Sequence, residues 1–389
     1  MTNLLKDALS SAVATFSRPS RQVATGPHDH VGRTPHIDSE QLAILRTAIE
    51  RSTHCSSFIN QDLVWGGRSV NLNSSNLAWW LVERAATTSA SQAIHDLDAF
   101  GGSDSIPGSV VMAIAGPEVK DPDTLSNRVA LKRLDDIPRS MPVQSPPPIS
   151  NGLMFGTWPT CLLVVQYTTP RALGSASKAA ASSQRAGLKR IRQDLNDVRL
   201  GLVLASNGGA SVHSYWAAPN EDIPCSDSIA EHGYGLPADQ PDTTFIRKDG
   251  IADIERYLQL EDKPLSRVKT VLRYLNEAIV SAQTTARAVS LGTALEVMFG
   301  QRGNTSELMF RTSVAAARYL GETAQERKEL FDTCKKVYGF RSQAVHMGDF
   351  AKDLTTVNGY LDAGQHILFQ ALAKFVREPI DDWTAVVLG

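Results

Sequence analysis

The 389-residue chain contains only four cysteines, and no two of them are close together in sequence. Because they form no C-x-x-C pair, they argue against a structural zinc site and against a disulfide framework. No apolar stretch reaches the roughly 18 to 20 residues that a membrane-spanning helix needs. The N-terminal segment MTNLLKDALSSAVATF lacks the basic start and the continuous apolar centre of a signal peptide. These absences predict a protein of the reducing cytoplasm with no membrane partner.

A large excess of charge of either sign is absent too. The formal net charge is -2 and the pI is about 6.5, so the whole chain is not a polycation that coats nucleic acid. The nucleotide-binding P-loop, the G-x-S-x-G elbow of hydrolases and the H-E-x-x-H zinc motif do not occur. Any attraction for nucleic acid must therefore be local.

Residues 1–37 are predicted to form a flexible tail, because positions 18–37 are polar and rich in proline, glycine and histidine. His28 and His30 form an H-x-H pair within this tail. The pair is either half of a metal site or part of a solvated loop, and two further ligands are not evident nearby.

Residues 38–220 are predicted to form a mixed α/β domain, with Asp38 or Ser39 capping its first helix. Asn207-Gly208-Gly209-Ala210 is a candidate hairpin turn between its last two strands. The expected helices cover 42–52, 78–100 and 182–200, and the expected strands cover 110–116, 161–167, 200–206 and 212–218.

The expected helix over 182–200 carries several basic side chains. Such a run is either a solvated helix face or a surface that contacts RNA phosphates. The residues concerned are Arg185, Lys189, Arg190 and Arg192, the last three being the candidates for RNA binding.

Residues 221–247 contain many turn-forming residues and no periodicity, which is typical of a linker. Residues 248–389 show helical periodicity throughout and are predicted to form an antiparallel bundle with its own core. Thr323 and Glu326 have the spacing of a capping box at the start of one helix. The predicted fold class is α+β, a mixed α/β domain followed by an all-α bundle.

The C-terminal part of that helix places a charge where a core residue is expected. Arg341 continues an apolar stripe that includes Val337 and Val345 at helical spacing. Because an unpaired guanidinium is costly to bury, either a carboxylate meets Arg341 or the stripe opens there into a polar cleft. Glu296, within an apolar helical segment, is the candidate partner; the alternative is an ordinary solvent-facing glutamate.

Three pieces occur in order in the helical half of the chain. They are ALEVMF at 294–299, Phe310 followed by Ala315-Ala316, and the string Y-x-x-R-S-x-x-V-H-x-G at 338–348. With these pieces, residues from about 250 to 378 resemble the HEPN superfamily, and within it the Apea-like branch found in bacterial anti-phage proteins. An R-x4-H spacing alone arises often by chance, but the longer string is much more specific.

The resemblance implies an endoribonuclease of a defence or toxin system that acts as a homodimer without metal or other cofactor, with Arg341 and His346 as catalytic residues. RNA carries its own nucleophile, the 2′-OH, so a histidine that titrates near neutral pH can do the proton work. An arginine fork suits phosphate oxygens. The expected substrates are tRNA or phage and host transcripts. The N-terminal half is expected to sense a phage trigger or to position the RNA.

Five helical positions separate two side chains by about 140°, so one regular helix does not aim Arg341 and His346 at the same point. Either the helix loosens before Gly348, or the two residues face different parts of a cleft that two copies share. Ser342 is a candidate hydrogen-bond donor to phosphate or an ordinary helix serine. Tyr338 is either a base-stacking ring or a core residue.

Two departures from the family pattern leave other functions open. Ser342 stands where many HEPN nucleases have Asn, Asp or His, and Met347 interrupts the common His-Gly-Gly ending. One alternative is a non-catalytic HEPN module for dimerisation or for nucleotide or RNA binding. Another is a HEPN toxin controlled by a nucleotidyltransferase antitoxin.

Overall fold

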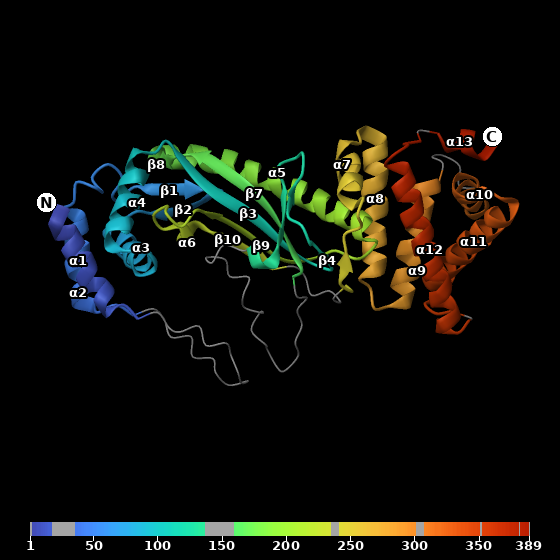
Figure 1. Ribbon diagram of the computed structural model, residues 1–389, viewed down its shortest axis with the longest axis horizontal. Helices are drawn as coiled ribbons and strands as arrows, with labels where there is room; N and C mark the ends of the chain where they lie inside the picture. The colour runs from blue at the N-terminus through green and yellow to red at the C-terminus, as the bar shows by residue number, and fades with distance from the viewer. Residues whose placement is uncertain are drawn as a thin grey trace.

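The computed structural model describes residues 2–17, 36–136, 159–234, 241–300, 307–350, 352–380 and 382–388. Strands lie in the N-terminal half and the C-terminal part is helical, so the predicted α+β class is confirmed. The two halves follow one another along an elongated molecule, with the chain ends at opposite extremes (Figure 1). His28 and His30 lie outside the described residues.

Four helices form the N-terminal end of the molecule: α1 (Thr2–Thr15), α2 (Ser39–Glu50), α3 (Ser74–Thr87) and α4 (Ala90–Gly102). The prediction of a flexible tail is wrong for its first part, because α1 buries Leu5, Leu9 and Ala12 on one face. Asp38 caps α2 as predicted. The single helix expected over 78–100 is broken in two, since the Ser89 side chain accepts a hydrogen bond from the Gln92 amide and starts α4.

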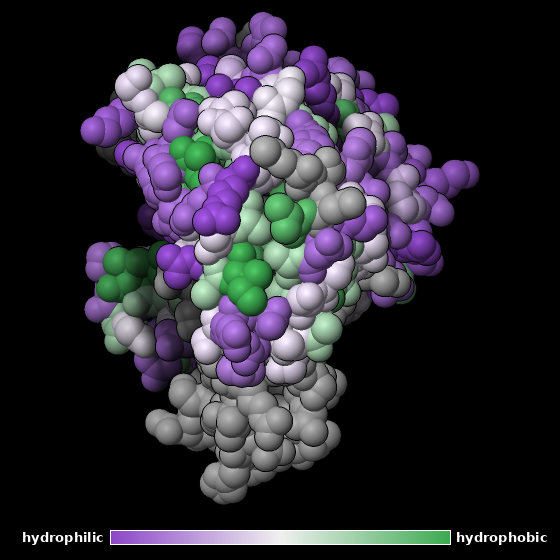
Figure 2. Space-filling model, turned by 90° about the vertical axis from the view of Figure 1, so that its left-hand side faces the viewer, coloured by the Kyte–Doolittle hydropathy of each residue, from purple (hydrophilic) through white to green (hydrophobic). Residues whose placement is uncertain are grey.

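Seen from this end, the surface is mostly hydrophilic, with small hydrophobic patches (Figure 2). Leu4 of α1 and Ile44 of α2 are among the exposed large apolar side chains. Isolated apolar residues of this kind are normal on a protein surface.

A six-stranded antiparallel sheet fills the middle of the molecule, in the order β10-β9-β3-β7-β6-β5. Alternate residues of its strands enter two cores: Val110 lies in the larger one, which α5 covers, and Val111 lies in a smaller one on the opposite face. The strands are β3 (Ser105–Ala115), β5 (Asp123–Thr124), β6 (Ala130–Arg133), β7 (Cys161–Pro170), β9 (Ser211–Pro219) and β10 (Glu231–Tyr234). Strands β3, β7 and β9 confirm three of the four predicted strands.

Smaller elements surround this sheet. They are β1 (Asp62–Trp65), β2 (Arg68–Asn71) and β8 (Ala172–Leu173) in one three-stranded sheet, β4 (Pro117–Glu118) paired with β11 (Thr244–Phe245), the 3-10 helix η1 (Leu134–Asp136) and the short helix α6 (Ser226–Ile229).

The fourth predicted strand, 200–206, is wrong: these residues are the last turns of the long helix α5 (Ser175–Ser206). All seven of them are buried, so the segment has no polar face, and an apolar run of this length is the same in a buried helix and a buried strand. Asn207, with a φ of 52°, ends α5, and the turn that follows joins a helix to β9 instead of forming a hairpin.

The described parts of 221–247, residues 221–234 and 241–247, contain strands that pair with the rest of the fold, so the prediction of a linker is wrong for them. Strand β10 pairs with β9, with Glu231 opposite Ala217, and β11 pairs with β4. The partner of β11 is distant in sequence, so the segment carries no signal of that pairing, whereas β10 pairs with the strand that precedes it in the chain.

The C-terminal bundle contains α7 (Gly250–Gln259), α8 (Asp262–Ile279), α9 (Thr284–Phe299), α10 (Leu308–Leu320), α11 (Ala324–Met347), α12 (Leu354–Phe375) and α13 (Trp383–Leu388). Helix α9 packs against α8, α10, α11 and α12. The predicted capping box is confirmed, with Thr323 and Glu326 satisfying each other's backbone amides at the start of α11. Across the described residues, no helix combines the length and the apolar character that crossing a membrane requires.

Candidate active site on helices α9 and α11

Arg341 lies on the face of α11 that packs against α9. A Cβ atom at Gly292 of α9 would lie 2.6 Å from Cδ of Arg341, so only glycine leaves space for this side chain. Glycine inside a helix costs roughly 0.5–1 kcal/mol relative to alanine. Helix α9 is therefore less stable than it would be with alanine at position 292, and the glycine leaves room for the Arg341 side chain.

Glu296 lies one turn after Gly292 on α9 and meets the same arginine. Its Oε2 is 3.4 Å from Nη2 of Arg341, which confirms the predicted carboxylate partner. The pairing is loose, because Oε2 of Glu296 and Nε of Arg341 are both buried without a hydrogen-bond partner among the described residues. The two side chains are 32% and 28% exposed, so the guanidinium keeps access to solvent and unused donors.

Tyr338 lies one turn before Arg341 on α11. Nη1 of Arg341 donates to its hydroxyl at 3.5 Å, and the guanidinium carbon is 5.3 Å from its ring centroid. The ring is half-buried and also lines a pocket of about 510 Å³. Tyr338 thus contacts the arginine and also lines this pocket.

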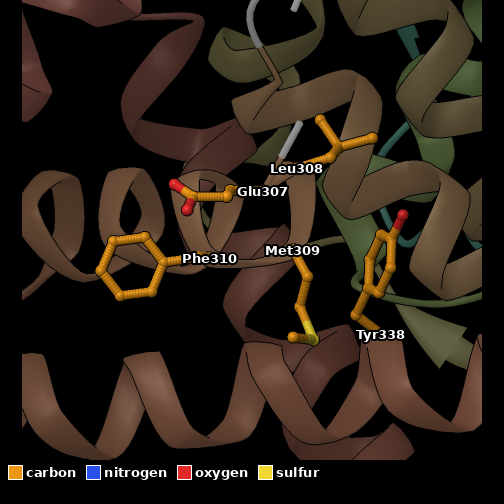
Figure 3. Close-up of a pocket in the computed structure, with 5 residues that line it drawn as sticks. All are labelled: Glu307, Leu308, Met309, Phe310 and Tyr338. Atoms are coloured by element: carbon orange, nitrogen blue, oxygen red, sulfur yellow. The ribbon is translucent and has the colours of Figure 1, made fainter. Parts of the chain in front are cut away.

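The rest of the pocket comes from the start of α10: Glu307, Leu308, Met309 and Phe310. In the view of Figure 3, Met309 lies between the rings of Phe310 and Tyr338. The Phe310 side chain is 54% exposed and packs edge-on against Phe331. Glu307 adopts a φ of 59°, a left-handed conformation that is uncommon outside glycine and is found at functional sites.

His346 is exposed near the end of α11. The helix stays regular to Met347 and ends at Gly348, which has a φ of 70°, so the expected loosening before Gly348 is wrong. Arg341 and His346 therefore leave α11 about 140° apart and do not converge within one chain. Val345, expected in the buried stripe, is 57% exposed, since Phe340 is the last buried residue of α11.

The remaining predicted residues divide between two parts of the molecule. Ser342 is half-buried on α11, next to the arginine. Lys189 and Arg190 are exposed on α5, which lies against the sheet (Figure 1). Arg192 forms an ion pair with Glu231 of β10, and its guanidinium carbon lies 4.2 Å from the Tyr215 ring centroid. The charge of Arg192 is therefore paired with an edge strand of the sheet. The structure does not bring these basic residues to Arg341.

Other reactive groups are not assembled into a site. The four cysteines are buried, and burial raises the pKa of each thiol to about 12, so none is a thiolate near neutral pH. Within the described ranges, no three His, Cys, Asp or Glu side chains are grouped as metal ligands would be.

Gly292 and the pocket residues Leu308 and Met309 were not predicted from the sequence. A glycine inside an apolar helix, four residues before a lone glutamate, was a usable signal, because such glycines often mark a close approach. The pocket had no local signal, since α10 and α11 form it together.

Comparison with protein-family models finds no match, and neither curated proteins nor solved structures give one. The HEPN resemblance therefore rests on the residues themselves and stays a prediction.

Proposed function

We propose that this protein is an endoribonuclease of a bacterial defence or toxin system that cuts RNA by attack of a 2′-OH on the adjacent phosphate. The observation that carries the proposal is the setting of Arg341. A guanidinium with unused donors lies between a loosely paired carboxylate and an aromatic wall, beside an apolar pocket. A phosphate with an attached unpaired base needs such a combination.

The reaction needs no more than proton transfer and charge stabilisation. The 2′ oxygen bonds to phosphorus, the bond from phosphorus to the 5′ oxygen breaks, and the products carry a 2′,3′-cyclic phosphate and a 5′-OH. Arg341 would bind the phosphate oxygens, on which negative charge develops. A histidine would take the 2′-OH proton, and another would give a proton to the leaving 5′ oxygen.

His346 of one chain points away from its own Arg341, so the proposed enzyme is a homodimer that combines groups from two copies. Val345 and Met347, the sequence neighbours of this histidine, are exposed, and so is Leu354 at the start of α12. Burying these apolar side chains between two copies would bring two His346 side chains to one cleft.

The pocket beside Tyr338 would hold the base next to the scissile phosphate. Phe310 and Tyr338 offer ring faces, and base stacking on aromatic side chains contributes about 1–3 kcal/mol per base. Bases are available for such stacking only where they are unpaired. The proposed substrate is therefore a single-stranded segment or loop, as in the anticodon arm of a tRNA.

The test is incubation of purified protein with total tRNA in EDTA, followed by sizing of the fragments and analysis of their ends. We expect cleavage by the wild type with cyclic-phosphate ends, and at least a hundredfold slower cleavage by His346→Ala. The matched control is His366→Ala, an exposed histidine of α12, which should cleave normally. Equal cleavage by all three proteins would contradict the proposal.

One observation favours the alternative of a non-catalytic HEPN module for dimerisation or RNA binding: Arg341 and His346 diverge on a regular helix. In that case the wild type would bind single-stranded RNA without cutting it, and Arg341→Ala would weaken binding while His346→Ala would not.

A further inference from the structure

A second charged cluster lies where α7 meets the ends of two other helices. Asp253 of α7 is 0% exposed, and three arginines converge on its carboxylate: one from α7 itself, one from just before it and one from beyond the end of α12. Arg247 donates to Oδ2 at 2.9 Å, Arg256 to Oδ1 at 2.9 Å, and Arg377 to Oδ1 at 3.1 Å. These four residues are called the Asp253 cluster below.

The cluster connects the two halves of the molecule. Arg247 also donates to the Leu204 carbonyl at the end of α5, and a Cβ atom at Gly250 would lie 2.9 Å from the Ala205 oxygen. Arg377 lies just after Val376, the C-cap of α12, and the other end of α12 follows the end of α11 along the chain. The 22 residues of α12 place the cluster about 30 Å from the Arg341 end of the bundle.

The charges of the cluster do not balance. Three guanidinium groups surround one carboxylate, which leaves an excess of two positive charges. The C-terminal ends of α5 and α12 reduce this excess by roughly half a charge each, and the N-terminus of α7 adds about half a positive charge, so the cluster stays positive by this count. All three arginines donate to the carboxylate, whose two oxygens offer about four acceptor sites, so hydrogen bonding to Asp253 is satisfied while the positive charge is in excess.

The arginines also keep donors that Asp253 does not use. Within the described part of the chain, Arg256 donates only through Nη1, and Nε of Arg247 is buried with no acceptor. The Arg256 and Arg377 side chains are 44% and 45% exposed, so their remaining N–H groups face solvent. Nη1 of Arg256 and Nη2 of Arg377 bind the same oxygen at 2.9 Å and 3.1 Å, so they lie no more than 6.0 Å apart.

We propose that the Asp253 cluster binds a phosphate group of a small molecule, such as inorganic pyrophosphate or the phosphate chain of a nucleotide. A tetrahedral anion can accept hydrogen bonds of about 2.8 Å from two arginines this close together. The basic residues converge on one point instead of forming a stripe, which fits a compact anion better than an RNA backbone. The bound anion ties α7 to the end of α12, and this inference does not depend on the ribonuclease activity.

The test is thermal unfolding of the full chain in sodium pyrophosphate, compared with sodium chloride at equal ionic strength. We expect pyrophosphate to raise the Tm by about 2–5 °C at saturation. The double variant Arg256→Gln/Arg377→Gln should lose this rise, and Arg318→Gln, an exposed arginine of α10, should keep it. If the double variant does not fold, Arg256→Gln alone serves, since this arginine makes one bond to Asp253.

Calorimetric titration with pyrophosphate then separates a ligand site from a purely structural network. Asp253→Asn removes the competing negative charge, so we expect it to bind pyrophosphate more tightly than the wild type. No heat of binding and no Tm rise in the wild type would overturn the proposal. A single-stranded RNA probe that binds Arg256→Gln/Arg377→Gln about tenfold more weakly would also overturn it, because the cluster would then be part of an RNA path.

Discussion

Two of the places where the bundle holds arginines against carboxylates are built in opposite ways. At the Asp253 cluster, a fully buried carboxylate receives several hydrogen bonds of 2.9–3.3 Å from three arginines. At the α9–α11 site, a partly exposed carboxylate lies 3.4 Å from one arginine, and atoms of both partners stay unsatisfied.

This difference indicates that the Asp253 cluster contributes mainly to stability, whereas the α9–α11 site presents a charge that a ligand can contact. A buried and saturated carboxylate is strongly tied to its neighbours, because removing it leaves charges without a counterion. A loose and partly exposed ion pair contributes little to stability, about 0–1 kcal/mol, but it presents a positive charge that a ligand can use. Charge alone does not distinguish the two sites, whereas burial and satisfaction of the carboxylate do.

The largest effect on stability is expected from Asp253→Ala. It leaves three neighbouring guanidinium groups without their shared anion, and because each is one-third to one-half exposed, we expect a loss of about 2–4 kcal/mol in the free energy of unfolding. Urea denaturation measures this loss. Asp362→Ala, which removes an exposed partner of Arg287, is the control and should cost less than about 1 kcal/mol. Equal losses in the two variants would remove the distinction.

Arg341→Ala should have a large effect on RNA cleavage and a small effect on stability. Loss of the phosphate-binding guanidinium should slow RNA cleavage about 10²–10³-fold, while the free energy of unfolding changes by less than about 1 kcal/mol. Arg341→Lys should recover little activity, because an ammonium lacks the fork geometry. Cleavage rates and denaturation curves on the same preparations check both parts. A variant that loses stability as much as Asp253→Ala would show that Arg341 has a structural role.

Gly292→Ala tests whether the position of Arg341 matters, because it changes no charge. The added methyl group would clash with the Arg341 side chain, so the guanidinium has to move, and we expect cleavage to slow about tenfold. The control is Gly359→Ala on α12, where a Cβ atom meets nothing within 4 Å. That variant should keep full activity and gain about 0.5–1 kcal/mol from helix propensity. Full activity in Gly292→Ala would mean that the position of Arg341 does not limit cleavage.

A third carboxylate, Glu326, is expected to have the smallest effect on stability. It is exposed, and hydrogen bonds from the backbone amides of Thr323 and Glu322 lower its pKa from the ordinary 4.5. The folded state therefore binds this proton less readily, so the contribution to stability is present above pH 4.5 and is lost as the pH falls through the folded pKa. We expect the Tm difference between wild type and Glu326→Gln to shrink between pH 5 and pH 3. A difference that does not change with pH would contradict the capping role.

Sequence reasoning succeeded where the residues themselves carry a physical signal. The capping box at Thr323 and the carboxylate partner of Arg341 were predicted, because the capping-box spacing and the cost of a buried charge can both be read from the residues. The pairing of β11 with β4 and the contact between Arg377 and Asp253 were missed, since the partners are distant in sequence, 124 residues apart in the second case. The end of α5 was mistaken for a strand because complete burial erases periodicity.

Helix α5 has a mechanical consequence. Its 32 residues form one uninterrupted rod about 48 Å long, which begins beside β8 and ends under α7. One continuous helix therefore packs against the three-stranded sheet, the central sheet and α7, so these elements share a single backbone support.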